Sequence, residues 1–164
     1  FIGAGYVGFV QVPVILMLIV LVITALIMNK TKMGRHIYAV GGNAQAAVFS
    51  GIKVSRVKFF VHAFSGVMAG LAGIVLASRM YSGQPTAGEG AEMDAIAAVV
   101  VGGTSMAGGS GKIGGTIIGA LIIGILNNGL NLLNVNSFWQ DVVKGIVILL
   151  AVFIDYVKNT KEKA

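Results

Sequence analysis

The hydrophobic residues of this chain gather in long apolar runs that short polar stretches separate. The first two runs cover residues 10–29 and 57–80, and two more cover 112–133 and 138–157. An α-helix needs about 20 apolar residues to cross roughly 30 Å of hydrocarbon. Each run is close to that length, so the pattern predicts four helices that cross a membrane.

A shorter apolar stretch begins at Met93 and leads into the glycine-rich sequence "GGTSMAGGSGKIGG". It is too short to cross a bilayer as one helix. We therefore expect 93–111 to form a fifth, discontinuous segment, in which a short helix ends at a glycine-rich break. Irregular backbone at membrane depth must be buried in protein or line a cavity, and broken helices often mark a transport path. The predicted fold class is all-α, a polytopic membrane helix bundle with about five membrane segments.

The distribution of charge predicts how this bundle is oriented. Residues 30–58 contain six basic side chains and no acid, and three lysines follow position 157. The positive-inside rule places both stretches in the cytoplasm, so the loop 30–56 and the C-terminus are expected there. The range 93–111 then has to carry the chain from outside to inside. The alternative, a re-entrant loop at 93–111, would leave the lysine-rich tail outside, against the same rule.

Composition agrees with a membrane protein and excludes several kinds of chemistry. Of the 164 residues, 56% are hydrophobic and only 11% are charged, against about 25% in soluble domains. Without cysteine, and with His36 and His62 far apart, we expect no metal site. No catalytic constellation is present, so an enzyme is not expected. The basic residues are explained by topology and do not indicate nucleic-acid binding.

The glycine-rich stretch contains a Gly111–Lys112 pair that resembles a phosphate-binding loop. A P-loop needs G-x-x-x-x-G-K-[ST], but the first position here is Met106 and the last is Ile113. A dinucleotide fingerprint also fails, because the next acid after Gly114 is Asp141. We expect this chain to bind no nucleotide or other cofactor, and we expect its glycines to serve turning and close packing.

The basic loop contains a short helix signal in "GGNAQAAVFSGI". Asn43 suits an N-cap and Gly51 suits the C′ position after the helix. One interpretation is a surface helix at the lipid headgroups, and the other is a helix that docks into a cytoplasmic partner. The residues concerned are Asn43, Ala44, Gln45, Ala46, Ala47, Val48, Phe49, Ser50 and Gly51.

A few polar residues lie inside the predicted membrane segments, where they need partners. They are Asp94, Thr104, Ser105, Asn127, Asn128 and Asn131. Hydrogen bonding between helices is the simpler interpretation for the asparagines, helix capping for the aspartate, and bonding to freed backbone groups for the hydroxyls. The functional alternative is that these side chains line a path for a solute.

Other features carry narrower expectations. Asp141 and Lys144 are three residues apart and are expected to pair on one helix. The small residues of Gly66-x-x-x-Gly70 and Gly115-x-x-x-Gly119 permit close contact between helices. On the outer side, Arg79, Glu89 and Glu92 are candidates for contact with an external protein, although solvated surface explains them equally well.

Long segments of the chain resemble one family of transport proteins. The segments are "GRHIYAVGGNAQAAVFSGI", "QPTAGEGAEMDAIAAVVVGGTSMAGGSGKIGGTIIGALIIGILNNGLNLL" and "VVKGIVILLAVFID". They resemble the C-terminal half of the membrane permeases of sugar-type, ribose-permease-like ABC importers. The resemblance covers nearly the whole chain and is strongest over residues 94–111.

This resemblance implies a function and a set of partners. The permease would move a monosaccharide such as ribose across the inner membrane of a bacterium, as a homodimer. A separate ATPase subunit would hydrolyse ATP, and an extracytoplasmic binding protein would deliver the sugar. The helix at Asn43–Ser50 would be the coupling helix to the ATPase. Because the first residue is Phe1, we expect the chain to be a fragment of a longer permease.

Two other classes of function remain as alternatives. One is a fragment of a secondary transporter or channel, although the spans at 10–29 and 112–133 contain no acid and His62 is the only ionisable residue deep within 57–80. The other is a membrane scaffold that transports nothing. It predicts that changes at 43–50 leave association with an ATPase untouched.

Overall fold

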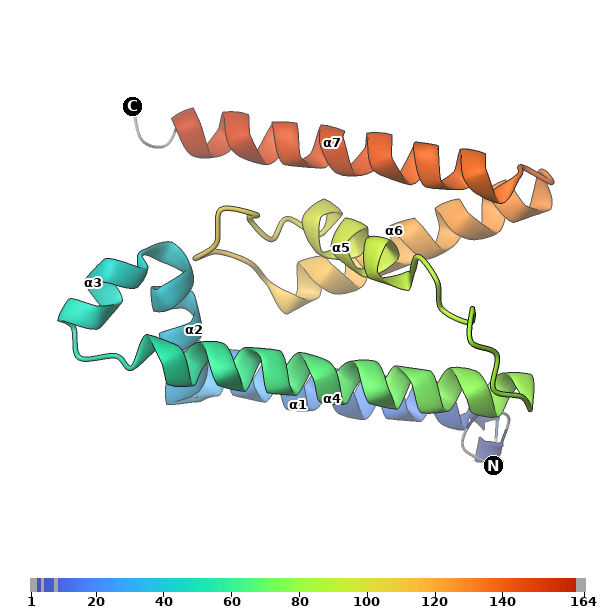
Figure 1. Ribbon diagram of the computed structural model, residues 1–164, viewed down its shortest axis with the longest axis horizontal. Helices are drawn as coiled ribbons and strands as arrows, with labels where there is room; N and C mark the ends of the chain where they lie inside the picture. The colour runs from blue at the N-terminus through green and yellow to red at the C-terminus, as the bar shows by residue number, and fades with distance from the viewer. Residues whose placement is uncertain (1–2, 4, 8, 162–164) are drawn as a thin grey trace. The chain divides into compact units, whose positions relative to one another are not determined.

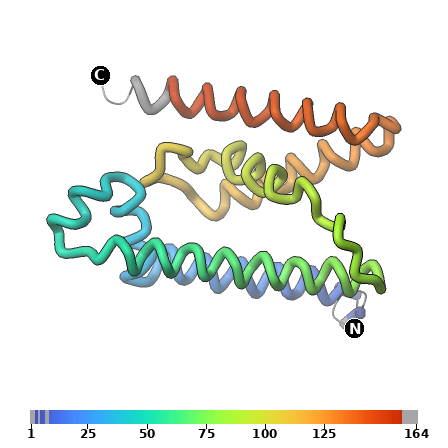
Figure 2. The backbone as a smooth tube through the Cα atoms, viewed as in Figure 1, coloured from blue at the N-terminus to red at the C-terminus, as the bar shows by residue number. Residues whose placement is uncertain are grey.

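The computed structural model describes residues 3, 5–7 and 9–161, and within them the chain forms seven α-helices and one small β-hairpin (Figure 1). The helices divide into two compact units, Phe1–Glu89 and Gly90–Ala164. Figure 2 follows the backbone through each unit. The lysine-rich tail expected on the cytoplasmic side lies mostly outside the described side chains, and Lys163 lies outside the described residues.

The first unit begins with a hairpin that the all-α prediction did not include. Strands β1 (Tyr6–Val7) and β2 (Val10–Gln11) pair antiparallel. The Gln11 amide donates a hydrogen bond of 3.0 Å to the Tyr6 hydroxyl. Helix α1 (Val12–Lys30) follows directly, with a proline in its first turn, where a missing N–H is tolerated.

Helix α2 (Lys32–Gly42) was not predicted, because the sequence analysis treated this stretch as loop. Three glycines lower its intrinsic helix propensity. A local cap and a close contact with α1 accompany it instead. The Thr31 hydroxyl accepts a hydrogen bond from Gly34 N at 3.2 Å, and a methyl group at Gly34 would lie 2.6 Å from the carbonyl oxygen of Ile27. The close approach of α2 to the end of α1 therefore requires a glycine.

The first unit continues with the short helix α3 (Ala44–Phe49) and the long helix α4 (Val54–Met80). Helices α1 and α4 line a common apolar groove. Glycines 66, 70 and 73 of α4 have no atom within 4 Å of the position that a side chain would occupy. The expected close contact at this small-residue face is therefore absent from the unit.

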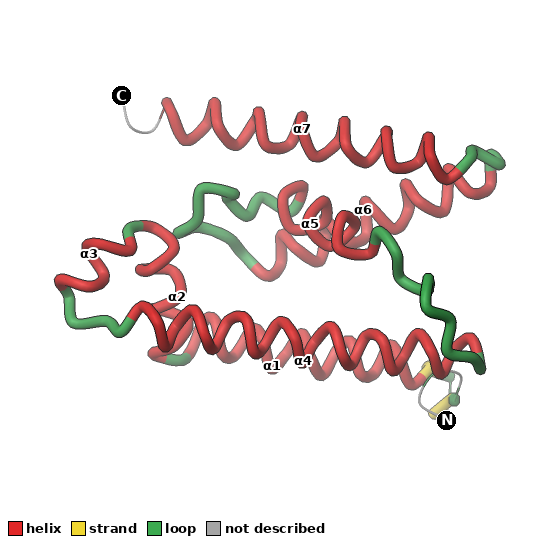
Figure 3. The backbone as a smooth tube through the Cα atoms, in the orientation of Figure 1, coloured by secondary structure: helices red, strands yellow, loops and turns green. Residues whose placement is uncertain are grey.

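The second unit contains α5 (Ala91–Val101), α6 (Ile113–Leu132) and α7 (Ser137–Lys161). Helix α5 packs on both α6 and α7. Ala97, Ala98 and Ile123 form its buried core, against which Val147 and Ile148 pack. Figure 3 shows the non-helical segment that joins α5 to α6.

Glycines allow α5 and α6 to approach almost backbone to backbone. A methyl group at Gly119 would overlap the carbonyl oxygen of Ala98 and lie 2.8 Å from Gly102 N. One at Gly102 would lie 2.5 Å from the carbonyl oxygen of Gly115. The contact predicted for Gly115 and Gly119 is confirmed.

Four helices are long and apolar enough to cross a membrane, namely α1, α4, α6 and, over Ser137–Val157, α7. They fall on four of the five ranges expected from the hydrophobic pattern. The fifth range, 93–111, contains the 11-residue α5 and a non-helical stretch. The chain is therefore a helical, multi-span membrane protein.

Candidate functional site

Helix α3 is defined by caps at both of its ends. The Asn43 side chain accepts a hydrogen bond of 2.9 Å from Ala46 N, which confirms the predicted N-cap. At the other end, Gly51 has φ +79°. Its N–H donates to Val48 O at 2.9 Å, and Ile52 N donates to Ala47 O at 3.0 Å. These two bonds form a Schellman motif, so the limits of α3 follow from local sequence.

The surface of α3 presents large apolar side chains to its surroundings. Phe49 is 90% exposed and Val48 is 58% exposed, whereas Ala47 is buried. A helix with one anchored face and an exposed aromatic residue can dock as a unit into a groove. It can equally place that aromatic residue among lipid headgroups. The geometry of α3 is therefore compatible with both interpretations, a helix that docks into a partner and a helix at the lipid headgroups.

A polar cluster connects the three helices of the second unit. Lys144 Nζ of α7 lies 2.9 Å from Asp94 Oδ1 of α5. The Asn127 amide of α6 donates a hydrogen bond of 3.0 Å to Asp94 Oδ2. The predicted pair of Lys144 and Asp141 is present, but at the longer distance of 3.6 Å. Lys144 is thus held mainly by the neighbouring helix, which the local spacing did not indicate.

One acceptor of this cluster has no partner among the described residues. Asn127 Oδ1 is buried and accepts no hydrogen bond there. Leaving a buried acceptor unpaired costs about 1–3 kcal/mol. Asn127 Oδ1 is therefore an acceptor of this cluster that the described residues leave unsatisfied.

The other asparagines of α6 differ from one another. Asn131 accepts a hydrogen bond of 2.9 Å from the Gln140 amide. Asn128 is exposed and makes no side-chain hydrogen bond with the described residues. Asn127 and Asn131 are thus joined to neighbouring helices, as the simpler interpretation predicts. Asp94 contacts α6 and α7 instead of capping its own helix, because α5 begins at Ala91 with Gly90 as its N-cap.

The glycine-rich stretch is a tightly folded loop. Gly103 has φ +82°, and the bonds from Gly103 N to Val100 O at 2.9 Å and from Thr104 N to Val99 O at 3.1 Å end α5 in a Schellman motif. Two more glycines, 108 and 109, adopt positive φ. The break after α5 is therefore encoded by residues that tolerate left-handed backbone.

Ser105 joins this loop to the far end of α7. Its side chain is 8% exposed and donates a hydrogen bond of 2.9 Å to Asp155 Oδ2. The same hydroxyl accepts a bond of 3.3 Å from Ala107 N. This agrees with the prediction that hydroxyls at the break bond to freed backbone groups. For Thr104, the structure places its side chain beside Gly111.

Sequence reasoning missed Asp155 and the true partner of Lys144. A signal was present, because both are ionisable residues within the apolar run that ends the chain, and such residues need partners inside a membrane. Their partners could not be identified from spacing, because Asp94 and Ser105 lie 50 residues away.

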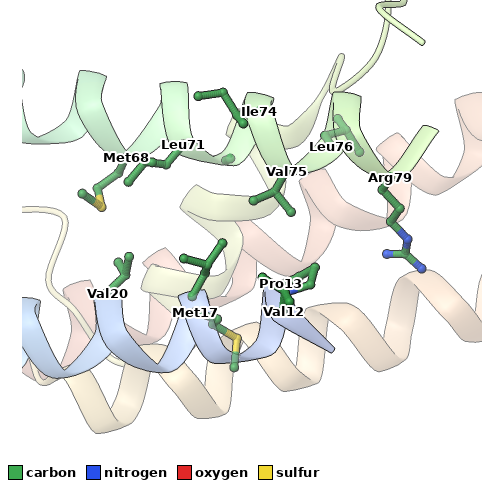
Figure 4. Close-up of a pocket in the computed structure, with 12 residues that line it drawn as sticks. Val12, Pro13, Met17, Val20, Met68, Leu71, Ile74, Val75, Leu76 and Arg79 are labelled. Carbon is green, nitrogen blue, oxygen red and sulfur yellow. The ribbon is translucent and has the colours of Figure 1, made fainter. Parts of the chain in front are cut away.

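The groove of the first unit is apolar, in contrast to the polar cluster of the second unit. It encloses about 660 Å³ between α1 and α4 and is lined mainly by aliphatic side chains (Figure 4). Arg79 lies at one end of it, beside Val12 and Pro13. Such walls offer almost no hydrogen bonds to a sugar, which makes this groove a poor candidate for a solute path.

The other residues selected from the sequence lie outside the polar cluster around Asp94 and outside the glycine-rich loop. Arg79, Glu89 and Glu92 are all exposed. His62 bonds through Nδ1 to Lys58 O of its own helix at 2.8 Å. Within the described residues, no group of three His, Cys, Asp or Glu side chains could hold a metal ion.

Comparison with known proteins assigns this arrangement to a family. Residues 1–152 match the family described as "Branched-chain amino acid transport system / permease component". The chain therefore belongs to this family of transport permeases. No solved structure matches the chain.

Ribose and xylose permeases are among the curated proteins that the chain matches. The chain is 57% identical to the ribose import permease protein RbsC of Bacillus subtilis over 157 residues, which cover 96% of this chain and 49% of that protein. The Escherichia coli K12 protein of the same name is 55% identical over 92% of this chain and 47% of its own length. The xylose transport system permease protein XylH of Haemophilus influenzae is 48% identical, over 87% of this chain and 38% of that protein. The chain spans about half the length of the ribose permeases it matches.

Proposed function

We propose that this chain is part of the membrane permease of a binding-protein-dependent ABC importer that takes up a monosaccharide such as ribose. The observation that carries the proposal is the 57% identity to a ribose import permease over nearly the whole chain. Ribose is preferred to xylose because the identity to the xylose permease is lower, at 48%. ATP would be hydrolysed by a separate subunit, and a binding protein would deliver the sugar.

Uptake by cells tests this proposal. A bacterial strain without its own ribose and xylose permeases would receive the full-length permease together with its ATPase and binding protein. We expect uptake of labelled ribose that excess unlabelled ribose abolishes and excess xylose reduces only weakly. Uptake of xylose alone would show that xylose, not ribose, is the substrate. Uptake of neither sugar would contradict the proposal.

Within this permease, α3 is proposed as the coupling helix that sits in the ATPase subunit. Its capped ends and its exposed Phe49 support a rigid element that docks as a unit. The chain has no cysteine, so a single Ala46→Cys can be paired with cysteines along the ATPase groove. We expect cross-linking that changes with ATP. If no groove position cross-links in an intact complex, α3 is a lipid-surface helix.

The segment 93–111 is proposed to cross from the outer to the inner side. Asp94 contacts Lys144 of α7, and Ser105 contacts Asp155, which lies further along α7. Helix α5 and its loop thus advance in the same direction as α7. An 11-residue helix covers about 16 Å, so the glycine-rich loop would complete the crossing.

Accessibility to a membrane-impermeant maleimide tests this topology. We expect Ala107→Cys to be labelled only from the cytoplasmic side and Gly83→Cys only from outside. Labelling of both from outside would show that the segment re-enters.

In the same proposal, these residues form the C-terminal half of a homodimeric permease. Peptide mapping of the intact membrane polypeptide should then find them in its second half.

Of the candidate path residues Asp94, Thr104, Ser105, Asn127, Asn128 and Asn131, we assign Asp94 and Ser105 to contacts with α7 and keep the other four as path residues. The unpaired acceptor of Asn127 and the exposed amide of Asn128 support a contact with sugar hydroxyls. We expect Asn128→Leu to raise the sugar concentration needed for half-maximal uptake in the assembled importer. An unchanged concentration dependence would remove Asn128 from the path.

A further inference from the structure

The face of α7 that packs on α5 has a charged residue at each end. Lys144 and Asp155 are 11 residues apart, which is close to three helical turns and places them on one face about 16 Å apart. Val147 and Ile148, which pack against the unit's core, lie on the same side of α7 between them. The face of α7 is thus apolar in its middle and ionic at both ends.

The segment from α5 to its loop presents matching groups at the same spacing. Asp94 and Ser105 are also 11 residues apart, and each meets its counterpart on α7 at 2.9 Å. The first turn of α5 and the loop that follows the helix therefore meet α7 in the same order along the chain. A slip of one turn, about 5.4 Å, would break both contacts at once.

We propose that Lys144 and Asp155 are positioning residues that clamp α5 and the glycine-rich loop onto α7 in one register. The clamp makes the discontinuous segment move together with α7 during transport. An apolar interface made of alanine and valine would not define this register, because such surfaces fit at several offsets. Ionic and hydrogen-bonded contacts between helices are the kind that specify register.

This inference rests on the proposed function, since it assigns α5 and its loop to the sugar path. It extends that proposal by stating which parts of the permease stay fixed to each other. Alternating access then has to occur at another surface, because the contact between α5 and α7 does not open. Without the clamp, α5 and its loop can shift independently of the movement that the ATPase drives. More ATP is then hydrolysed for each sugar molecule transported.

Cross-linking of the cysteine-free permease tests whether this contact stays closed. The variant Ser105→Cys/Asp155→Cys is made in the full-length permease, assembled with its ATPase and binding protein, and treated with a short methanethiosulfonate cross-linker. In the reduced state, we expect more ATP hydrolysed per sugar imported. Once linked, the variant should regain a ratio close to that of the unsubstituted permease.

Two results of this experiment would overturn the proposal. One is a linked permease that loses uptake and regains it on reduction, because α5 would then have to slide along α7. The other is a failure to link although each single cysteine reacts with the reagent, because the contact would then be absent in the membrane. The cross-linking yield needs no transport, so this second result is distinct from a failure of the proposed sugar uptake.

Charge exchange at the other end of the clamp gives an independent test. Asp94→Lys and Lys144→Asp each place like charges together, and we expect each to raise the ATP hydrolysed per sugar roughly tenfold or more. The double variant restores an opposite pair and should recover most of the coupling. Asp141→Asn is the matched control, because its carboxylate is 67% exposed and lies 3.6 Å from Lys144. Single variants that keep normal coupling, or a double variant no better than either single one, would overturn the clamp.

Discussion

Helices α4 and α6 both have glycines four residues apart, yet they use them differently. In α6, Gly115 and Gly119 touch the backbone of α5 so closely that no side chain would fit. In α4, the positions beside Gly66 and Gly70 are open. The motif thus creates a flat helix surface, and contact follows only where a neighbour offers an equally flat one.

Polar contacts differ between the two units in the same way. Helices α1 and α4 contain no acidic residue, so no ion pair can connect them, and their shared groove is nearly all apolar. In the second unit, Asp94 joins α5 to both α6 and α7. Polar side chains therefore connect the helices of the second unit, whereas α1 and α4 of the first unit meet through apolar side chains.

The largest effect is expected at the α5–α6 contact. Gly119→Leu would force the backbones of the two helices apart, because even a methyl group there overlaps Ala98 O. We expect a loss of stability of more than about 3 kcal/mol, at the upper end for overpacked cores. Thermal unfolding of the full-length permease in detergent measures it.

Gly70→Leu is the matched change on α4. Within the first unit it meets open space, so we expect little change in the unfolding temperature. A loss as large as that of Gly119→Leu would show that this face packs against a segment outside the present chain. Equal tolerance at both positions would contradict the close packing of α5 on α6.

Removing the cation of the polar cluster should have the next largest effect. Lys144→Ala leaves Asp94 without its closest opposite charge. The Asp94 side chain is 34% exposed, so we expect a cost of about 2 kcal/mol, between the values for surface and buried pairs. The double variant Asp94→Asn/Lys144→Met should recover much of that loss, because neither charge remains. A fall in unfolding temperature that the double variant does not reduce would show that the two residues act independently.

A smaller loss is expected at the glycine-rich loop. Ser105→Ala removes the bond to Asp155 and leaves that carboxylate with one donor fewer, at a cost of about 1–2 kcal/mol. Ser110→Ala, at an exposed position in the same loop, serves as the control. Protease cleavage within the loop, measured in membranes, should accelerate for the first variant only. Equal rates would mean that the bond does not hold the loop.

The smallest effect falls in the first unit, at the cap of α3. Asn43→Ala removes the hydrogen bond to Ala46 N and should cost about 1 kcal/mol of local stability. We expect faster amide hydrogen exchange confined to α3, with Asn43→Ser close to the unsubstituted rate. If exchange is unchanged, the helix is held by contacts other than its cap.

The sequence predicted those features that depend on local chemistry. The caps of α3 were readable because Asn43 and Gly51 satisfy a helix end whatever surrounds it. The long helices followed from apolar runs for a similar reason. Helix α2 was missed because its stability depends on contact with α1 at Gly34, which no local pattern reveals.

The candidate site was predictable in its members but not in its pairings. Asp94, Ser105 and Asn127 were selected because polar groups inside apolar segments need partners. The pairing of Lys144 was assigned to Asp141, three residues away, although the closer partner is Asp94 on another helix. Long-range contacts of this kind depend on how α5 is placed on α7, and spacing within one helix does not determine that.

ATP-driven uptake in a purified system tests the central proposal most directly. The full-length permease and its ATPase are reconstituted in proteoliposomes, with ATP inside and the binding protein and labelled ribose outside. We expect ribose to accumulate only when ATP and the binding protein are both present, and the Phe49→Asp variant in α3 to abolish accumulation while the permease stays folded. Accumulation that is independent of ATP, or driven by an ion gradient, would show that the chain belongs to a different kind of transporter.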